Sequence, residues 1–309
     1  MSDLAVALVW HTHPFEDLLA LVRRAEALGY RAAYVDGDVS MIDSRGDADV
    51  LDGWTATAAL LASTSRIEIG SIRLVHHWNP ARLAQAVATA ERIAPRRLRF
   101  LISIGAYAGD RRFGLPFPPA PERLAWLAEL LPVLRALWAG ATVTAKSRFF
   151  ELEGARVRPA IRRTGGLPIE VGGRGARLLE VVAAHADRWD VNLPPVARRV
   201  LDATRRLEAA CRRRGRDPAA IGRSMWVWTR VGSDPSDAAV RAAYRRWNPW
   251  FGGVPDAELA EAIVAGPAGR CRERVAEIRE GLGVDLPVLD LAGLDRVGAE
   301  RVMEALAGA

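Results

Sequence analysis

The sequence predicts an α/β protein of the closed (β/α)8 class, a TIM barrel, and three observations carry this prediction. Short apolar runs alternate with longer helical patterns almost from end to end, and eight of these runs are strand candidates. The runs are nearly continuous in Val, Ile and Leu, which indicates strands buried on both faces, as in a parallel sheet. The first strand-to-helix turn, His11 to Pro14, contains no glycine. Because an open nucleotide-binding sheet usually has its glycine fingerprint at that turn, the closed barrel is favoured.

The strand candidates are short and separated by stretches that repeat the helical period. In chain order they are Leu4–Trp10, Ala32–Asp36, Ile67–Val75, Leu98–Ile104, Pro168–Val171, Trp189–Asn192, Ser224–Val231 and Pro287–Leu291. Between them, apolar residues recur at spacings of three and four, as in an amphipathic helix. Such stretches include Phe15–Leu28, Trp54–Ser63, Pro80–Ile93, Pro121–Trp138 and Val196–Arg214.

Three segments exceed the regular repeat, and all belong to one predicted domain, residues 1–309. Residues 106–121 form a Pro/Gly-rich loop after strand four. Before strand five, two short strands are expected, Thr142–Ala145 and Arg148–Leu152. A third irregular zone, Arg245–Pro255, follows strand seven. Long insertions on one barrel most often shape the mouth of its active site.

The composition excludes several classes of protein. The net charge is +6 and the pI is near 10.1, but the arginines are spread among glutamates over many helices. A nucleic-acid-binding protein would have a clustered basic face, so no nucleic acid is expected, whereas a small acidic ligand fits. No apolar run approaches the length of a membrane helix and no signal peptide is apparent, so a cytoplasmic protein is expected. Cys211 and Cys271 lack CxxC spacing, and neither a disulfide nor a metal site is expected.

A glycine turn follows the fifth strand candidate and opens a helix. It reads Gly172-Gly173-Arg174-Gly175, and the helix begins near Ala176. Glycines let the backbone approach a ligand closely, and the N–H groups of a helix N-terminus favour an anion. Arg174 and Arg177 add forked, charged donors that suit phosphate. The turn therefore predicts a phosphate site at Gly172, Gly173, Arg174, Gly175 and Arg177, although a tight turn that binds nothing has the same local pattern.

Polar side chains collect at the expected carboxyl ends of the strands, where barrel enzymes keep their chemistry. His11 and His13 end strand one, Asp38 follows strand two, and His76 follows strand three. We expect these residues to line a functional pocket. Each histidine is equally compatible with a hydrogen bond to a neighbouring loop.

Several stretches, in their order and spacing, resemble the bacterial luciferase-like monooxygenase family, which includes the coenzyme F420-dependent oxidoreductases. The likeness covers nearly the whole chain. Its main pieces are AEALGYRAAYVDGD at Ala25–Asp38, DGWTATAALLASTSRIEIGS at Asp52–Ser71, NPARLAQAVATAERI at Asn79–Ile93, LPIEVGGRGARLLEVVAAHADRW at Leu167–Trp189 and AGPAGRCRERVAEIREGLGVD at Ala265–Asp285.

The resemblance implies a barrel, commonly a homodimer, that binds FMN or F420 at the carboxyl ends of its strands. It implies that the cofactor phosphate lies at the glycine turn after strand five. It also implies a bulge and a non-proline cis peptide at the end of strand three, pressing on the cofactor ring at Gly70, Ser71 and Ile72. An ordinary strand bulge is the alternative for Gly70-Ser71.

The chain departs from the family pattern at strands two and four. F420-type members often have Asp-His where this chain has Gly37-Asp38. The sugar-phosphate branch places a glutamate where Ala106 stands. Two of the three strand-four glycines are replaced, by Leu101 and Ser103, which leaves Gly105 as the expected cofactor contact. The His/Glu pair of that branch is therefore missing from its usual places.

The leading hypothesis is hydride transfer between coenzyme F420 and a small organic substrate, by reduction of a C=C or C=N bond or the reverse. A nearby acid then exchanges the proton, and the candidates are Asp38, His11, His13 and His76.

Two alternative functions stay open, and a third is disfavoured. An FMN-dependent monooxygenase would need a partner reductase and an apolar lining, for which the candidates are Trp10, Trp78, Trp228, Trp247 and Trp250. Of these, Trp247 and Trp250 better fit a core or a dimer interface. A degenerate barrel without cofactor is the second alternative. A metal-dependent hydrolase is disfavoured, because the single lysine, Lys146, lies in the predicted hairpin.

Overall fold

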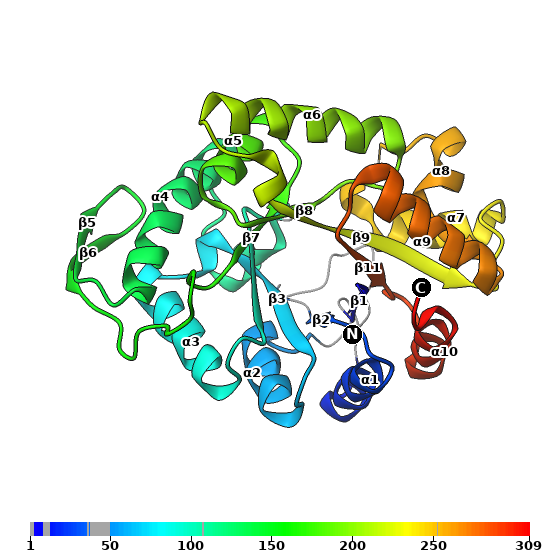
Figure 1. Cartoon of the computed structure of the whole chain (residues 1–309), viewed down its shortest axis with the longest axis horizontal. Coiled ribbons are helices and arrows are strands. Elements are labelled where there is room, and N and C mark those ends of the chain that lie inside the picture. The colour runs from blue at the N-terminus through cyan, green and yellow to red at the C-terminus, as the bar shows by residue number, and fades with distance from the viewer. Residues whose placement is uncertain (1–2, 9–12, 36, 38–49, 107, 252) are drawn as a thin grey trace.

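Eight parallel strands close into a barrel surrounded by helices (Figure 1). The computed structural model describes residues 3–8, 13–35, 37, 50–106, 108–251 and 253–309, and the statements below concern these residues. The strand order is β9-β11-β1-β2-β3-β4-β7-β8, and pairing of β8 with β9 completes the ring. The barrel strands are β1 Ala5–Ala7, β2 Ala32–Val35, β3 Glu68–Leu74, β4 Leu98–Ser103, β7 Ile169–Gly173, β8 Arg188–Val191, β9 Gly222–Val231 and β11 Leu286–Asp290. The predicted barrel is confirmed, and each strand overlaps its predicted run.

The five helices predicted from apolar spacing are also confirmed. One cap shows how the local sequence sets a boundary: the Asn79 side chain accepts hydrogen bonds from the N–H groups of Ala81 at 3.0 Å and Arg82 at 3.1 Å, and Pro80 takes the first helical position. The α-helices are α1 Phe15–Ala27, α2 Gly53–Ser63, α3 Pro80–Ile93, α4 Ala120–Trp138, α5 Ala176–His185, α6 Ala197–Arg213, α7 Ala238–Trp247, α8 Asp256–Ala262, α9 Ala268–Leu282 and α10 Arg296–Leu306. Short 3-10 helices are η2 Val75–His77, η3 Ala108–Phe113, η4 Pro218–Ala220 and η5 Pro249–Phe251.

The three predicted insertions are present. The one before the fifth barrel strand is an antiparallel hairpin, β5 Val143–Lys146 and β6 Glu151–Ala155, beside α4 (Figure 1). Its second strand begins three residues later than predicted from Arg148–Leu152. The insertion after β9 contains α7, η5 and α8 and then β10, Val264–Gly266, which pairs with β9. That strand was not predicted, because three residues are too few to establish a period.

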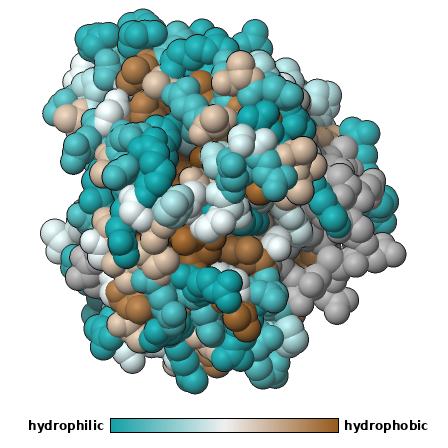
Figure 2. All heavy atoms as spheres, turned by 90° about the vertical axis from the view of Figure 1, so that its right-hand side faces the viewer, coloured by the Kyte–Doolittle hydropathy of each residue, from teal (hydrophilic) through white to brown (hydrophobic). Residues whose placement is uncertain are grey.

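The barrel interior is built by alternation along each strand. Along β1 and the residues that flank it, Leu4, Val6 and Leu8 pack in the large core between the barrel and its helices. Ala5 and Ala7 belong to a separate cluster inside the barrel. These small side chains share the interior with bulky aromatic ones: the Tyr34 ring lies 5.6 Å from the Trp226 ring. On the face shown in Figure 2, hydrophobic atoms gather near the centre and hydrophilic side chains surround them.

The end of strand three differs from what the family resemblance implied. β3 pairs with β4 without a register shift from Ile69 to Leu74, so no extra residue is left to form a bulge. Among the described residues, the cis peptide bond is Arg158–Pro159. The expected bulge and non-proline cis bond at Gly70, Ser71 and Ile72 are therefore wrong, and an uninterrupted hydrogen-bonded ladder takes their place.

A buried polar cluster lies across the barrel. The Glu170 carboxylate accepts hydrogen bonds from Arg99 Nη2 at 2.9 Å, from the Tyr34 hydroxyl at 2.9 Å and from Ser224. Arg99 also donates to Glu68 at 2.9 Å. Burial alone would raise the pKa of Glu170, but Arg99 and the Ser224 hydrogen bond hold it below the ordinary value. Glu170 is therefore an anion, and its negative charge is stabilised by Arg99 and by the neighbouring hydroxyl donors.

Candidate active site

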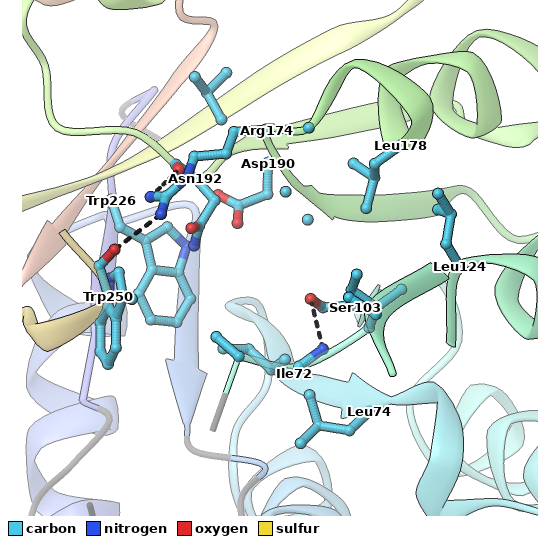
Figure 3. Close-up of a pocket in the computed structure, with 18 of the residues that line it drawn as sticks. Ile72, Leu74, Ser103, Leu124, Arg174, Leu178, Asp190, Asn192, Trp226 and Trp250 are labelled. Carbon is cyan, nitrogen blue, oxygen red and sulfur yellow. Dashed lines mark hydrogen bonds between the residues drawn. The ribbon is translucent and has the colours of Figure 1, made fainter. Parts of the chain in front are cut away.

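A cavity of about 420 Å³ opens at the carboxyl ends of the barrel strands, a size typical of small-molecule sites (Figure 3). Strands β3, β4, β7, β8, β9 and β11 contribute its floor, and the segments after β4, β7 and α7 contribute its walls. Its lining is mostly apolar, and the residues that form it are Ile72, Leu74, Ser103, Ile104, Gly105, Ala106, Ala120, Pro121, Leu124, Gly172, Gly173, Arg174, Gly175, Arg177, Leu178, Asp190, Val191, Asn192, Trp226, Asn248, Trp250, Phe251 and Asp290.

The glycine turn predicted from the sequence forms one wall of this cavity. Gly175 is the N-cap of α5 and provides no side-chain cap. Within the described part of the chain, the N–H groups of Gly175, Ala176 and Arg177 have no hydrogen-bond acceptor. A Cβ at Gly175 would meet nothing within 4 Å, so the turn is open toward the solvent. Free amides at an uncapped helix N-terminus fit an anionic group.

The two arginines of the turn have different surroundings. Arg174 donates to the carbonyl oxygens of Trp250 at 2.9 Å and Asn192 at 3.4 Å, as the dashed lines in Figure 3 show. Its guanidinium therefore ties the glycine turn to the insertion that carries Trp250. Arg177 is exposed, and no described residue pairs with its guanidinium. Of the two, Arg177 has the donors available for a ligand.

Gly172 and Gly173 make room for other parts of the protein. Gly172 lies inside β7, and a Cβ there would come 3.1 Å from Asp190 Oδ2. Gly173 has a φ of +144°, and a Cβ there would come 2.8 Å from the Leu178 side chain. Both line the cavity, but their lack of a side chain also serves packing, which the sequence pattern alone did not indicate.

The loop after strand four forms the opposite wall. Gly105, with a φ of +72°, and Ala106 line the cavity. Arg123, from α4, donates to the carbonyl oxygens of Ile104 at 2.6 Å, Gly105 at 3.1 Å and Pro118. Its guanidinium also lies 3.7 Å from the centre of the Phe117 ring. A single buried side chain therefore holds this wall in place.

Replacing Arg123 by alanine is expected to loosen the loop, because three partly buried carbonyl groups lose their donor. We expect the free energy of unfolding to fall by about 2–4 kcal/mol. Trypsin is expected to cleave after the exposed Arg111 and Arg112 faster than in the wild type. Limited proteolysis with mass spectrometry measures this. An unchanged cleavage rate at both sites would contradict the assigned role of Arg123.

Asp190 and Asp290 are buried carboxyl groups of the cavity lining, and sequence reasoning missed Asp190. Asp190 is 6% exposed and lies on β8. Burial, together with the neighbouring Glu170 charge, raises its pKa well above the ordinary value. A signal was available: Asn192 was identified as a strand end, and Asp190 lies two residues before it, on the same face of the strand.

Aromatic side chains supply the apolar wall, with one correction to the sequence-based interpretation. Trp250 lines the cavity, although the sequence favoured a core or interface role for it. Trp226 lines it too and was not identified. Trp228 is 2% exposed and packs beside Tyr244 in a separate cluster.

Of the four predicted catalytic residues, the structure describes His76 and His13. His76 is 2% exposed and packs against the rings of His77 at 4.5 Å and Phe117 at 5.1 Å, outside the cavity lining. His13 is also outside it. Burial lowers the pKa of His13, while Asp17 and Asp295 oppose the shift. His11 and Asp38 lie outside the described residues, so their roles stay predictions.

Of the three positions predicted on strand three, only Ile72 lines the cavity. Ser71 is buried on the opposite face, where its hydroxyl lies 2.7 Å from Thr57 Oγ1 and donates to the Gly53 carbonyl oxygen at 3.3 Å. Gly70 faces inward but below the cavity, where a Cβ would come 2.8 Å from the Tyr34 ring. Its lack of a side chain therefore serves the packing of Tyr34.

Among the described residues, no group of three or more His, Cys, Asp or Glu side chains is arranged to hold a metal ion. None of the helices defined there is long and apolar enough to cross a membrane.

Known proteins resemble this chain in sequence. It is 31% identical over 144 residues to the F420-dependent glucose-6-phosphate dehydrogenase of Beutenbergia cavernae, a match covering 46% of this chain and 42% of the relative. It is 28% identical over 256 residues to the pyrimidine monooxygenase RutA of Methylorubrum populi, covering 76% of this chain and 63% of the relative. The chain thus spans less than two thirds of either protein.

A solved structure shares the fold over its whole length. It is an F420-dependent secondary alcohol dehydrogenase in complex with an F420-acetone adduct, with a TM-score of 0.84, 20% identity and 99% coverage of both chains. The profile of the luciferase-like monooxygenase family matches residues 3–286. The barrel, the glycine turn at its rim and this match together show that the chain belongs to the luciferase-like monooxygenase family.

Proposed function

We propose that this protein is an oxidoreductase that transfers a hydride between coenzyme F420 and a small organic substrate. The observation that carries the proposal is the open, positively charged end of the cavity. Free amides of Gly175, Ala176 and Arg177 meet the exposed Arg177 guanidinium there, beside an apolar chamber of about 420 Å³. An anionic tail at the turn and a planar ring in the chamber fit this arrangement.

The shape of the turn favours F420 over FMN. FMN ends in a phosphate monoester, whereas F420 continues beyond its phosphodiester into an acidic tail. Such a tail needs an exit to solvent, and the exposed Gly175 and Arg177 leave one. When bound, the deazaflavin would supply a two-electron hydride carrier. The protein would hold its phosphate, orient the substrate against the ring and exclude water with Ile72, Leu74 and Trp250.

An FMN-dependent monooxygenase with a partner reductase is the second candidate. The aromatic wall of Trp226, Trp250 and Phe251 favours it, because an oxygenated flavin needs protection from water. Similarity to RutA over 76% of the chain points the same way. The degenerate barrel has less support, since a cavity with free amides lies beside Gly172. A homodimer remains part of the proposal through the family alone.

Titration of the purified protein with F420 and separately with FMN tests the proposal. We expect F420 to quench tryptophan fluorescence with a dissociation constant at least about tenfold below that of FMN, which corresponds to about 1.4 kcal/mol. Quenching is expected because Trp226 and Trp250 line the cavity in which the cofactor ring would bind. Tight FMN binding without F420 binding would replace the leading proposal with the monooxygenase. Binding of neither cofactor would support the degenerate barrel.

A further inference from the structure

Asp190 gives the cavity a carboxyl group that ring and phosphate binding do not require. Its backbone pairs with Gly172 on the neighbouring strand, and a Cβ there would come within 3.1 Å of its Oδ2 atom. The missing side chain at Gly172 thus leaves space for the carboxyl group. Figure 3 shows this group pointing into the cavity, between Asn192 and Leu178.

The hydrogen bonds around Ser224 bear on the state of this carboxyl group. Ser224 Oγ lies between two acids: it contacts Glu170 Oε1 closely and is 3.5 Å from Asp190 Oδ1. Glu170 is the anion, because it also accepts from Arg99 and from the Tyr34 hydroxyl, both at 2.9 Å. A serine hydroxyl has a single proton, and Glu170 takes it. The Asp190 carboxyl group, whose Oδ1 atom lies 3.5 Å from Ser224 Oγ, therefore has no donor at normal hydrogen-bond length on this side to stabilise a negative charge.

The charges around Asp190 also favour its neutral, protonated state. The groups that face it are Glu170 on β7, Arg99 on β4, Tyr34 on β2 and Ser224 on β9. Arg99 is the buried cation of this cluster, and it already pairs with Glu170 and Glu68 at 2.9 Å each. A charged Asp190 would add a further buried anion without a cation of its own, which is costly. Burial and the Glu170 charge accordingly raise its pKa.

The rest of the cavity suits a ligand that accepts hydrogen bonds. Ala106 supplies no acid at the position where the sugar-phosphate branch of the family is expected to have a glutamate. The Trp226 ring lines the cavity, but its indole N–H is buried. A neutral Asp190 can donate its proton toward the cavity. A donor in an apolar chamber fits a carbonyl or imine group.

We propose that Asp190 is a neutral carboxylic acid in the resting protein and donates the proton when a small ketone, enone or imine is reduced in this cavity. The proposal rests on the proposed function, which supplies the hydride from reduced F420. In a ketone, the carbonyl carbon gains the hydride, and the π electron pair moves to oxygen. That oxygen forms an O–H bond as the Asp190 O–H bond breaks. The resulting carboxylate regains a proton from solvent before the next turnover.

The state of Asp190 is tested without any cofactor by infrared spectroscopy of the wild type, Asp190→Asn and the control Asp202→Asn. Asn has the shape of a neutral Asp, so the variant is expected to fold. Asp202 is a half-exposed carboxylate on α6. We expect the wild type and the control to show the C=O band of a protonated carboxyl at pH 7, and Asp190→Asn to lack it. A wild type without this band would overturn the proposal.

Thermal unfolding across pH gives a second readout. The folded pKa of Asp190 is raised, so the folded protein keeps a proton that the unfolded chain releases above about pH 4. The wild type should therefore lose stability relative to Asp190→Asn as pH rises from about 4 toward the folded pKa. Over this pH range, the melting temperature of Asp190→Asn should rise relative to that of the wild type. A difference that is constant with pH would show that Asp190 ionises normally and would overturn the proposal.

Turnover with reduced F420 and a panel of small ketones, enones and imines tests donation itself. For the fastest probe we expect Asp190→Asn to lower kcat by about 10²–10⁴-fold, with KM and F420 affinity little changed. The wild-type rate should fall at high pH, and this limb should be absent in the variant. Unchanged kcat in the variant, or no reduced probe at all, would overturn the proposal. Failure of F420 to bind either protein would instead overturn the proposed function, and the titration distinguishes the two.

Discussion

Replacing Gly175 by aspartate is expected to weaken cofactor binding strongly while leaving the fold intact. Gly175 has extended backbone angles that any residue adopts, and a Cβ there meets nothing within 4 Å. An aspartate would fit and would cap α5, since its carboxylate can accept from the free N–H groups of the first turn. The same carboxylate would occupy the amides that the phosphate needs and would repel its charge. We expect affinity for F420 to fall about 100-fold or more, since losing one charge-assisted hydrogen bond costs about 1.5–3 kcal/mol before the repulsion.

The matched control is Gly175→Asn, which has the same shape and capping ability without the negative charge. We expect it to bind F420 more tightly than Gly175→Asp, with the difference shrinking at high salt. Melting temperatures of both variants should equal or exceed that of the wild type, because an Asn or Asp cap typically adds a few tenths of a kcal/mol over Gly. Fluorescence titration measures the affinities. Equal, undiminished F420 affinity in Gly175→Asp would show that the phosphate lies elsewhere.

Replacing Arg99 by alanine is expected to cost the largest amount of stability of any single change discussed, about 3–5 kcal/mol. Arg99 has a side chain that is 3% exposed, and it pairs with Glu170 and Glu68. Its removal would leave the Glu170 charge buried with only neutral donors. Urea denaturation at pH 7 measures the free energy of unfolding. Arg24→Ala is the control: its pair with Glu304 is as short, at 2.6 Å, but exposed, and we expect a loss below about 1 kcal/mol.

The cluster of Arg99, Glu170 and Glu68 also predicts how the free energy of unfolding changes with pH. The folded pKa of Glu170 lies below its ordinary value, so the cluster contributes stability above the unfolded pKa, near 4.3. This contribution is lost as pH falls through the folded pKa. The gap between the wild type and Arg99→Ala should therefore narrow on acidification below about pH 4. A gap that widens at low pH would contradict an ionised Glu170.

Local patterns predicted most of the architecture. Apolar runs located all eight barrel strands because a strand buried on both faces needs apolar side chains throughout. The glycine turn after β7 was located for a similarly local reason, since a close backbone approach depends on residues adjacent in sequence. Strand three shows the limit: the bulge implied for Gly70 and Ser71 came from a resemblance, while the ladder from Ile69 to Leu74 depends on both neighbouring strands.

The sequence by itself determined the barrel, its insertions and the glycine turn that lines the cavity, because each depends on periodicity or on neighbouring residues. The tertiary structure decided which side chains face one another inside the barrel. Glu170 meets Arg99 across 71 residues of chain and Ser224 across 54, and Arg174 reaches Trp250 across 76. The proton on Asp190 is a property of that assembly, since burial and the Glu170 charge arise only when distant strands close into one ring.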